Sequence, residues 1–137
     1  MANLNIVNVA SILGNTAQIT PGSGASAAWT IPGTGGTNVS VPGLTAPTGG
    51  VNRVTGIVVS NTTSSAATAT VAVGNNPTFA SSTTTTYLAY QVTVPPNASV
   101  IVVDKTTDFY VTEYMSVGVT SGTTSALTYT ATYEAMS

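Results

Sequence analysis

Short runs in which apolar and polar side chains alternate make up most of the chain after residue 50, and turn residues separate them. The first run is Val51 to Asn61, and the last is Leu127 to Glu134. Alternation with a period of two is typical of β-strands that bury one face. The last run accordingly places four side chains on one face: Leu127, Tyr129, Ala131 and Tyr133.

The runs between these two are Ala66 to Val73, Tyr87 to Val94, Ser99 to Val103, Phe109 to Val111 and Met115 to Thr120. Because the run Ala66 to Val73 follows the first strand across a short Thr/Ser turn, the spacing predicts a hairpin between the two. Its alternation places these side chains on one face: Ala67, Ala69, Val71 and Val73. The run Ser99 to Val103 is almost entirely apolar, which predicts a strand buried on both sides.

The first 50 residues have shorter alternating runs and a region rich in proline and glycine. Leu4 to Val9 reads as a short edge strand, and the run Ala17 to Thr20 stops at a Pro-Gly pair. Residues 21–50 hold four of the seven prolines and eight glycines, so any strand there, such as Ala27 to Ile31 or Thr37 to Val41, is expected to be short or peripheral. Two interpretations stay open: an extended arm that lies across a neighbouring subunit, or loops that cap the same subunit.

Length and strand spacing together define the predicted fold. The chain has 137 residues, which suits one domain, and 45 of them are Thr or Val, which favour strands over helices. Six or seven strands after residue 50 have the spacing of a β-sandwich or barrel, and the N-terminal strands bring the total near the eight of a jelly roll. We therefore predict an all-β fold: a jelly-roll-like antiparallel β-sandwich at residues 51–137, with a Pro/Gly-rich arm or loop region at residues 1–50.

Charge is scarce, because only 4% of the residues are charged, where about 25% is ordinary. A surface with so little charge repels its own copies weakly, which favours assembly over a solitary monomer. Two basic residues cannot form the cationic footprint that nucleic acid requires. No apolar run approaches the roughly 18 residues of a membrane-spanning helix, and Met1 to Asn5 lack the basic start of a signal peptide.

Several strings of residues resemble a known class of proteins. They are Val54 to Asn61, Tyr87 to Tyr90, Val94 to Ser99, Val102 to Lys105 and Leu127 to Glu134. Over residues 51–134 these strings resemble small virion proteins of tailed phages. Similar sequences tend to carry an acidic turn before the penultimate strand, where this chain has Tyr110 to Met115 instead. Any contact or ion binding by that turn is therefore not expected here.

The resemblance implies a β-sandwich or jelly-roll module without enzymatic activity that decorates or cements a phage capsid. Its expected location is the virion, assembled in the host cytoplasm, and its expected partners are the major capsid protein or other virion proteins and further copies of itself, as a trimer. The alternative is a neck, tail or fibre component that acts as an adaptor or binds host glycan. A pilus or surface-layer subunit is a third possibility, although such a subunit would normally be exported.

The sequence contains no cysteine and no histidine, and we expect no catalytic residue, cofactor or metal ligand. The one cluster of charges is Asp104, Lys105, Asp108 and Glu113. Its expected role is a solvated loop with a surface ion pair. A two-carboxylate hydrolase or a Ca²⁺ site is the rival interpretation, but no aromatic groove accompanies the carboxylates and their spacing matches no recognised calcium loop.

Four residues are candidates for an interface: Trp29, Arg53, Tyr110 and Tyr114. Arg53 would pair with Glu134 or Asp104 within the domain, or make a bidentate contact with a carboxylate on a capsid subunit. Trp29 would anchor an interface or fill the core of its own domain. The six tyrosines would line a sugar-binding face or, more simply, be strand residues with one buried side and a wet hydroxyl: Tyr87, Tyr90, Tyr110, Tyr114, Tyr129 and Tyr133.

Overall fold

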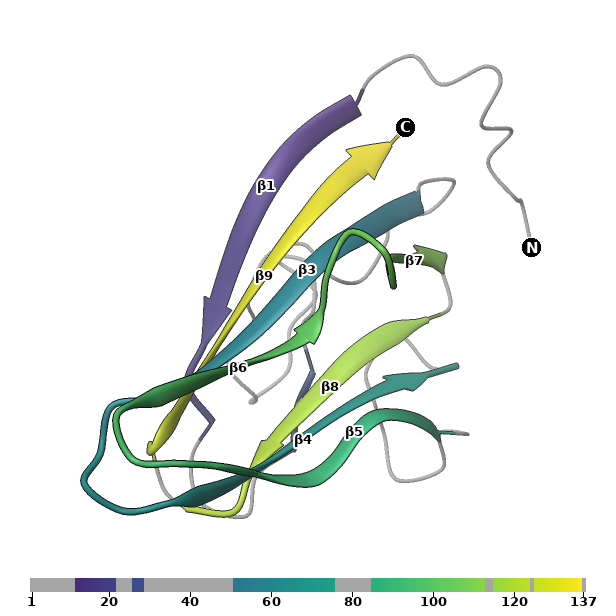
Figure 1. Ribbon diagram of the computed structural model, residues 1–137. Helices are drawn as coiled ribbons and strands as arrows, with labels where there is room; N and C mark the ends of the chain where they lie inside the picture. The colour runs from purple at the N-terminus through teal and green to yellow at the C-terminus, as the bar shows by residue number, and fades with distance from the viewer. Residues whose placement is uncertain are drawn as a thin grey trace.

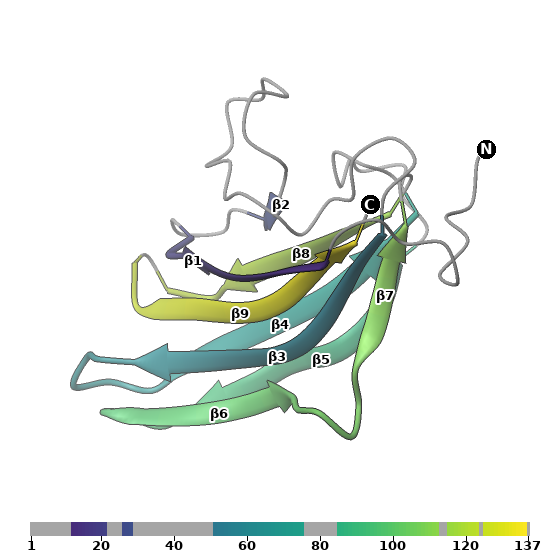
Figure 2. The same cartoon turned by 90° about the horizontal axis from the view of Figure 1, so that it is seen from above.

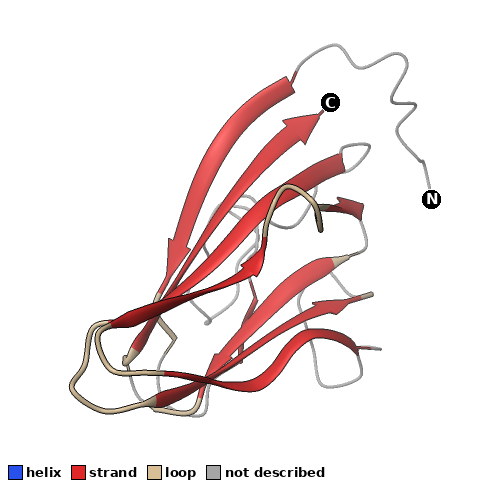
Figure 3. Cartoon of the chain, viewed as in Figure 1, coloured by secondary structure: helices blue, strands red, loops and turns tan. Residues whose placement is uncertain are grey.

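The structure is a computed structural model that describes residues 12–21, 26–28, 51–75, 85–112, 115–123 and 125–136. Within these residues the chain is all-β, with strands and connecting loops and no helix (Figure 3). The strands form two antiparallel sheets that face each other as layers (Figures 1 and 2). The predicted all-β class is confirmed.

The larger sheet has the strand order β1-β9-β3-β6, and β7 also pairs with β3. Its strands are β1 (Ile12–Ile19), β3 (Val51–Asn61), β6 (Ala98–Val103), β7 (Phe109–Thr112) and β9 (Leu127–Met136). The smaller sheet has the order β2-β8-β4-β5. Its strands are β2 (Ser26–Ala28), β4 (Ala67–Gly74), β5 (Thr85–Val94) and β8 (Ser116–Ser121).

Strand β3 is the centre of the larger sheet and has the predicted bounds. It pairs with β9 from Val51↔Met136 to Asn61↔Leu127 on one side, and with β7 and then β6 on the other. Its inward side chains join one hydrophobic cluster with those of the smaller sheet. The fully buried members of that cluster include Val54, Ile57, Val59, Val71, Val117, Val119, Leu127 and Tyr129.

The predicted hairpin between residues 51–61 and 66–73 is wrong, because β3 and β4 belong to different sheets. The connection crosses from one layer to the other around the buried amide of Asn61. Its Nδ2 donates to the carbonyls of Ser65 at 2.9 Å and Val94 at 3.1 Å, and its Oδ1 accepts from the Thr63 N–H at 3.0 Å. A buried side chain that satisfies these backbone groups holds the chain in an arch instead of a tight turn.

The expectation that Ser99 to Val103 is buried on both sides is also wrong. Strand β6 is an outer strand, and its residues alternate between partly buried and exposed as far as Val102, with Ile101 68% exposed, before the strand ends at the buried Val103. The apolar run is therefore not buried on both sides along its length. In β4 the predicted alternation holds to Val71 and then breaks, because a register shift at Val71/Ala72 leaves Ala72 buried and Val73 partly buried.

Other strand predictions agree with the structure. Among the described residues after position 50 there are seven strands, β3 to β9, and the predicted inner face of β9 is buried. The run Ala17 to Thr20 is the end of β1, which begins earlier, at Ile12. The first two residues of the run Ala27 to Ile31 belong to β2, and residues 29–31 lie outside the described residues. The predicted strands Leu4 to Val9 and Thr37 to Val41, and most of the Pro/Gly-rich stretch, lie outside the described residues.

Candidate interaction surfaces

Two of the candidate interface residues, Arg53 and Tyr110, lie side by side because they are register partners on β3 and β7. The guanidinium of Arg53 contacts Oδ2 of Asp108 through Nη2 at 2.5 Å and donates to it through Nε at 2.6 Å. Its Nη1 lies 3.6 Å from Oε2 of Glu134 on β9. Of the two predicted partners Glu134 is therefore present, and Asp108 takes the place of Asp104.

The electrostatics of this group are those of a solvated cluster. The hydrogen bond and the charge of Asp108 raise the pKa of Arg53, so the guanidinium stays charged. The side chains of Arg53, Asp108 and Glu134 are 39%, 25% and 40% exposed, so water screens the pairs. The cluster orients the loop before β7 more than it stabilises the fold.

Asp104 has its own local contacts. Its Oδ1 accepts from the backbone N–H of Thr106 at 2.8 Å and from the Thr106 hydroxyl at 2.6 Å. These hydrogen bonds, led by that of the Thr106 hydroxyl, lower the pKa of the Asp104 carboxyl. The carboxylate therefore shapes the β6–β7 loop, in agreement with the predicted solvated loop.

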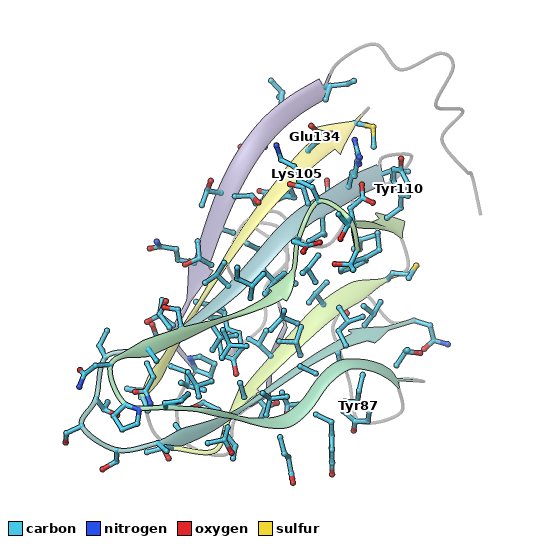
Figure 4. All side chains as sticks on the ribbon, in the orientation of Figure 1. Tyr87, Lys105, Tyr110 and Glu134 are labelled. Carbon is cyan, nitrogen blue, oxygen red and sulfur yellow. The ribbon has the colours of Figure 1, made fainter. Side chains whose placement is uncertain are left out.

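The charged side chains of the described residues gather at one end of the larger sheet. We call this group the charged corner, and its members are Arg53, Asp104, Lys105, Asp108 and Glu134. Figure 4 shows Lys105 and Glu134 near Tyr110 at this end, whereas Tyr87 lies on β5 in the other sheet. Outside the charged corner, the described surface carries no formal charge.

A second surface lies on β5 and the neighbouring strand β6, which the turn at residues 95–97 connects. Large apolar side chains are exposed there, at fractions between 38% and 68%. We call this group the apolar flank, and its members are Tyr87, Leu88, Tyr90, Val92 and Ile101. Four of these five side chains lie on one outer strand, β5. Exposed apolar side chains that concentrate on one part of a surface are typical of interaction sites.

Irregular pairing between β5 and β4 accompanies the contact between Tyr87 and Tyr90. The register shifts twice between Ala69↔Val92 and Ala72↔Tyr87, and Gln91 has a positive φ of 48°. The N–H of Gln91 donates to the hydroxyl of Thr70 at 3.1 Å. In a regular strand, side chains three residues apart face opposite sides. Here the rings of Tyr87 and Tyr90 meet edge to face, with centroids 4.7 Å apart.

Sequence reasoning named Tyr87 and Tyr90 only as members of a possible sugar-binding face, and it missed the rest of the apolar flank. Residues Tyr87 to Tyr90 carry large side chains at both odd and even positions, a pattern that a regular half-buried strand would not show. That pattern was the available signal. The candidates Trp29 and Tyr114 lie outside the described residues, so the structure leaves their roles untested.

Comparisons of the chain with family models, curated proteins and solved structures found no match. Among the described residues, no group of three or more acidic, histidine or cysteine side chains is placed to hold a metal ion. The same residues include no helix that would cross a membrane.

Proposed function

We propose that the chain is a non-enzymatic structural protein of a phage virion, most simply a capsid decoration or cement protein. In this proposal the two sheets form a jelly-roll-like β-sandwich, and residues 1–50 act as a Pro/Gly-rich arm. The protein would act in the virion as a homotrimer bound to the major capsid protein. The resemblance of residues 51–134 to small virion proteins of tailed phages supports this proposal.

The observation that carries the proposal is the apolar flank, whose exposed side chains belong to strands without a charged residue. The five charged side chains of the described residues lie in the charged corner, and the apolar flank exposes Tyr90 at 58% and Ile101 at 68% without a charged neighbour on its strands. A freely diffusing protein with such a flank would tend to associate. In a protein that functions in contact with other subunits, those subunits cover the flank.

The physical mechanism is mass action. A contact that exists only in the assembled shell stabilises the shell by the binding free energy of each copy. Many copies on one particle add modest contacts together. No residue has to perform chemistry, and an uncharged flank loses little hydration when a neighbour covers it.

The tyrosine pair favours a second candidate, a neck, tail or fibre component that binds host glycan. The rings of Tyr87 and Tyr90 are more than half exposed and stand beside the exposed Gln91. Aromatic rings with a few polar groups are the usual lining of small-ligand sites. The exposed Leu88 and Val92 on the same strand fit a protein partner better, so we place this candidate second.

The test is the number of copies on intact particles, measured by quantitative mass spectrometry against the major capsid protein. We expect hundreds of copies per particle. A few dozen or fewer would overturn the cement role in favour of the neck, tail or fibres.

A matched pair of variants then tests the apolar flank. We expect Leu88→Lys to reduce incorporation into particles severalfold. Ser64→Lys, which places the same charge on an exposed residue of the β3–β4 connection, should be incorporated normally. Equal incorporation of both variants would show that the flank is not the contact.

A further inference from the structure

Strand β1 is the most regular outer strand of the described residues. All eight of its residues stay in one register with β9, from Ile12↔Met136 to Ile19↔Tyr129. It contains no proline and no charged residue. Bulges, short length, prolines and charges are the features by which proteins keep an outer strand from pairing with another chain. Strand β1 has none of them.

The other outer strands do carry such features. Strand β5 has two register shifts, β2 has three residues and β7 has four. Strand β6 has six residues and runs directly into the charged loop that begins at Asp104. Among the described strands, β1 alone therefore offers a long and regular row of backbone donors and acceptors on its outer side.

The first half of β1 is also uncovered on its two faces. Residues 12–16 are all exposed, and the adjacent side chains of Ile12 and Leu13, which point to opposite faces, are 61% and 62% exposed. Only Ala17 and Ile19 reach the hydrophobic cluster. Figure 1 shows β1 at the margin of the larger sheet, with β9 on its inner side.

We propose that the outer edge of β1 pairs antiparallel with β1 of a second copy about a two-fold axis, so that the two larger sheets become one continuous sheet. The lack of charge argues for a second copy as the occupant. A two-fold antiparallel pair sets each side chain opposite or near a copy of itself, and like charges in such positions are destabilising. Strand β1 pairs with itself without that cost, and Ile12 and Leu13 gain apolar contacts across the pair.

This pairing goes beyond the proposed function, because it needs no capsid protein and concerns only two copies of this chain. A two-fold contact through β1 is compatible with a trimer that forms through another surface. It would then join one trimer to the next. Its failure would leave the copy number on particles unaffected, so the two proposals stand or fall separately.

Disulfide trapping tests the pairing, because the chain has no cysteine of its own. Six single-cysteine variants place the thiol at each position from 13 to 18, and Thr93→Cys on β5 is the exposed control. In a two-fold antiparallel pair one residue lies opposite its own copy, with Cα atoms about 4.5–5.5 Å apart, which is within disulfide range. We expect mild oxidation of the full-length protein to give a covalent dimer at one position, and severalfold less at its neighbours and in the control.

Hydrogen exchange on the unsubstituted protein provides a second readout that needs no variant. Pairing predicts that the outward amides of residues 12–16 become protected as the protein concentration rises. Dimer yields no higher than the control at all six positions would overturn the proposal. Protection of these amides at every concentration would also overturn it, because a segment of the same chain would then cover the edge.

Discussion

The two long outer strands, β1 and β5, have similar lengths but differ in how regularly they pair with their neighbours. Strand β1 keeps one register over its eight residues and is an outer strand of the described part of its sheet. Strand β5, with ten residues, breaks its register with β4 twice and turns Tyr87 and Tyr90 toward each other. A regular edge presents backbone groups, whereas a bulged edge presents side chains.

In both strands a few buried residues attach the strand to the core, and the other residues form exposed surface. Strand β1 is fixed to the core by Ala17 and Ile19 near its end, and β5 by Val94 at its end, which is fully buried. The remaining residues of both strands contribute mostly exposed surface. We therefore expect changes at the anchors to cost folding free energy, and changes elsewhere on these strands to alter contacts with other molecules.

The largest expected effect is at the anchor of β1. Ile19 is 3% exposed and lies in the shared cluster, so Ile19→Ala should lower the free energy of unfolding by about 3 kcal/mol. The matched change on β5 is Val92→Ala. Because Val92 is 38% exposed, this substitution should lower the free energy of unfolding by less than about 1 kcal/mol. Chemical denaturation at one protein concentration measures both. Equal losses would show that the two outer strands are packed alike.

The next effect concerns the amide that holds the end of β5. Asn61→Ala removes the donors to the Ser65 and Val94 carbonyls in a site where Asn61 is 2% exposed. Unpaired buried carbonyls should cost about 2 kcal/mol of unfolding free energy. The control is Asn15→Ala on β1, where the amide is exposed and donates to the Leu13 carbonyl at 3.3 Å. If the control costs as much as Asn61→Ala, the arch is not a determinant of stability.

A smaller effect lies beside the anchor of β1, at Tyr129, the register partner of Ile19. Its hydroxyl donates across the core to the Thr120 carbonyl at 2.6 Å, so Tyr129→Phe should cost about 1 kcal/mol. The control Tyr90→Phe removes a hydroxyl from a side chain that is 58% exposed and should change stability by less than about 0.5 kcal/mol.

Burial also makes Tyr129 a source of alkaline sensitivity. Desolvation raises its pKa from 10.0 to about 12, so above pH 10 the unfolded chain loses a proton that the folded protein keeps. The contribution of Tyr129 to the free energy of unfolding is therefore fully present below pH 10, and it is lost as the pH rises toward 12. Denaturation midpoints across this range should decline less steeply in Tyr129→Phe. Parallel declines would assign the sensitivity to other groups, such as Tyr133, whose pKa burial also raises.

Local patterns in the sequence were enough to predict the strands but not how they are arranged. The bounds of β3 and the inner face of β9 follow from alternation, which each segment carries in its own residues. The assignment of β3 and β4 to different sheets depends on contacts between Asn61 and Val94, 33 positions apart. A turn of Thr and Ser suits a hairpin or an arch, and only the long-range partner decides between them.

The candidate site was partly predictable for the same reason. Arg53 pairs with Glu134 as expected, because both lie on long strands, but the choice of Asp108 over Asp104 depends on how the β6–β7 loop closes. The carboxylate of Asp104 accepts hydrogen bonds from Thr106, two residues away, and this local contact orients it within its own loop instead of toward Arg53. The tyrosine pair depends on two register shifts that no alternation pattern contains.

The smallest expected effect tests the contrast between the strands with the same substitution in each. Both carry an exposed glutamine: Gln18 in the regular β1, and Gln91 at a positive φ of 48° in the bulged β5. Glycine adopts a positive φ without the steric cost that other residues pay, so Gln91→Gly should raise the free energy of unfolding by about 0.5 kcal/mol. In a regular strand glycine brings only its entropy cost, so Gln18→Gly should lower it by about 0.5–1 kcal/mol.

The opposite signs of the two changes in unfolding free energy are the informative result, because both sites are exposed glutamines in outer strands. Global differences between preparations would move both variants in one direction. Denaturation of the two variants beside the unsubstituted protein measures the signs, and NMR contacts between Tyr87 and Tyr90 report whether the bulge persists in Gln91→Gly. Destabilisation of both variants would mean that β5 pairs as regularly as β1 in solution, and the display of the tyrosine pair would then need another explanation.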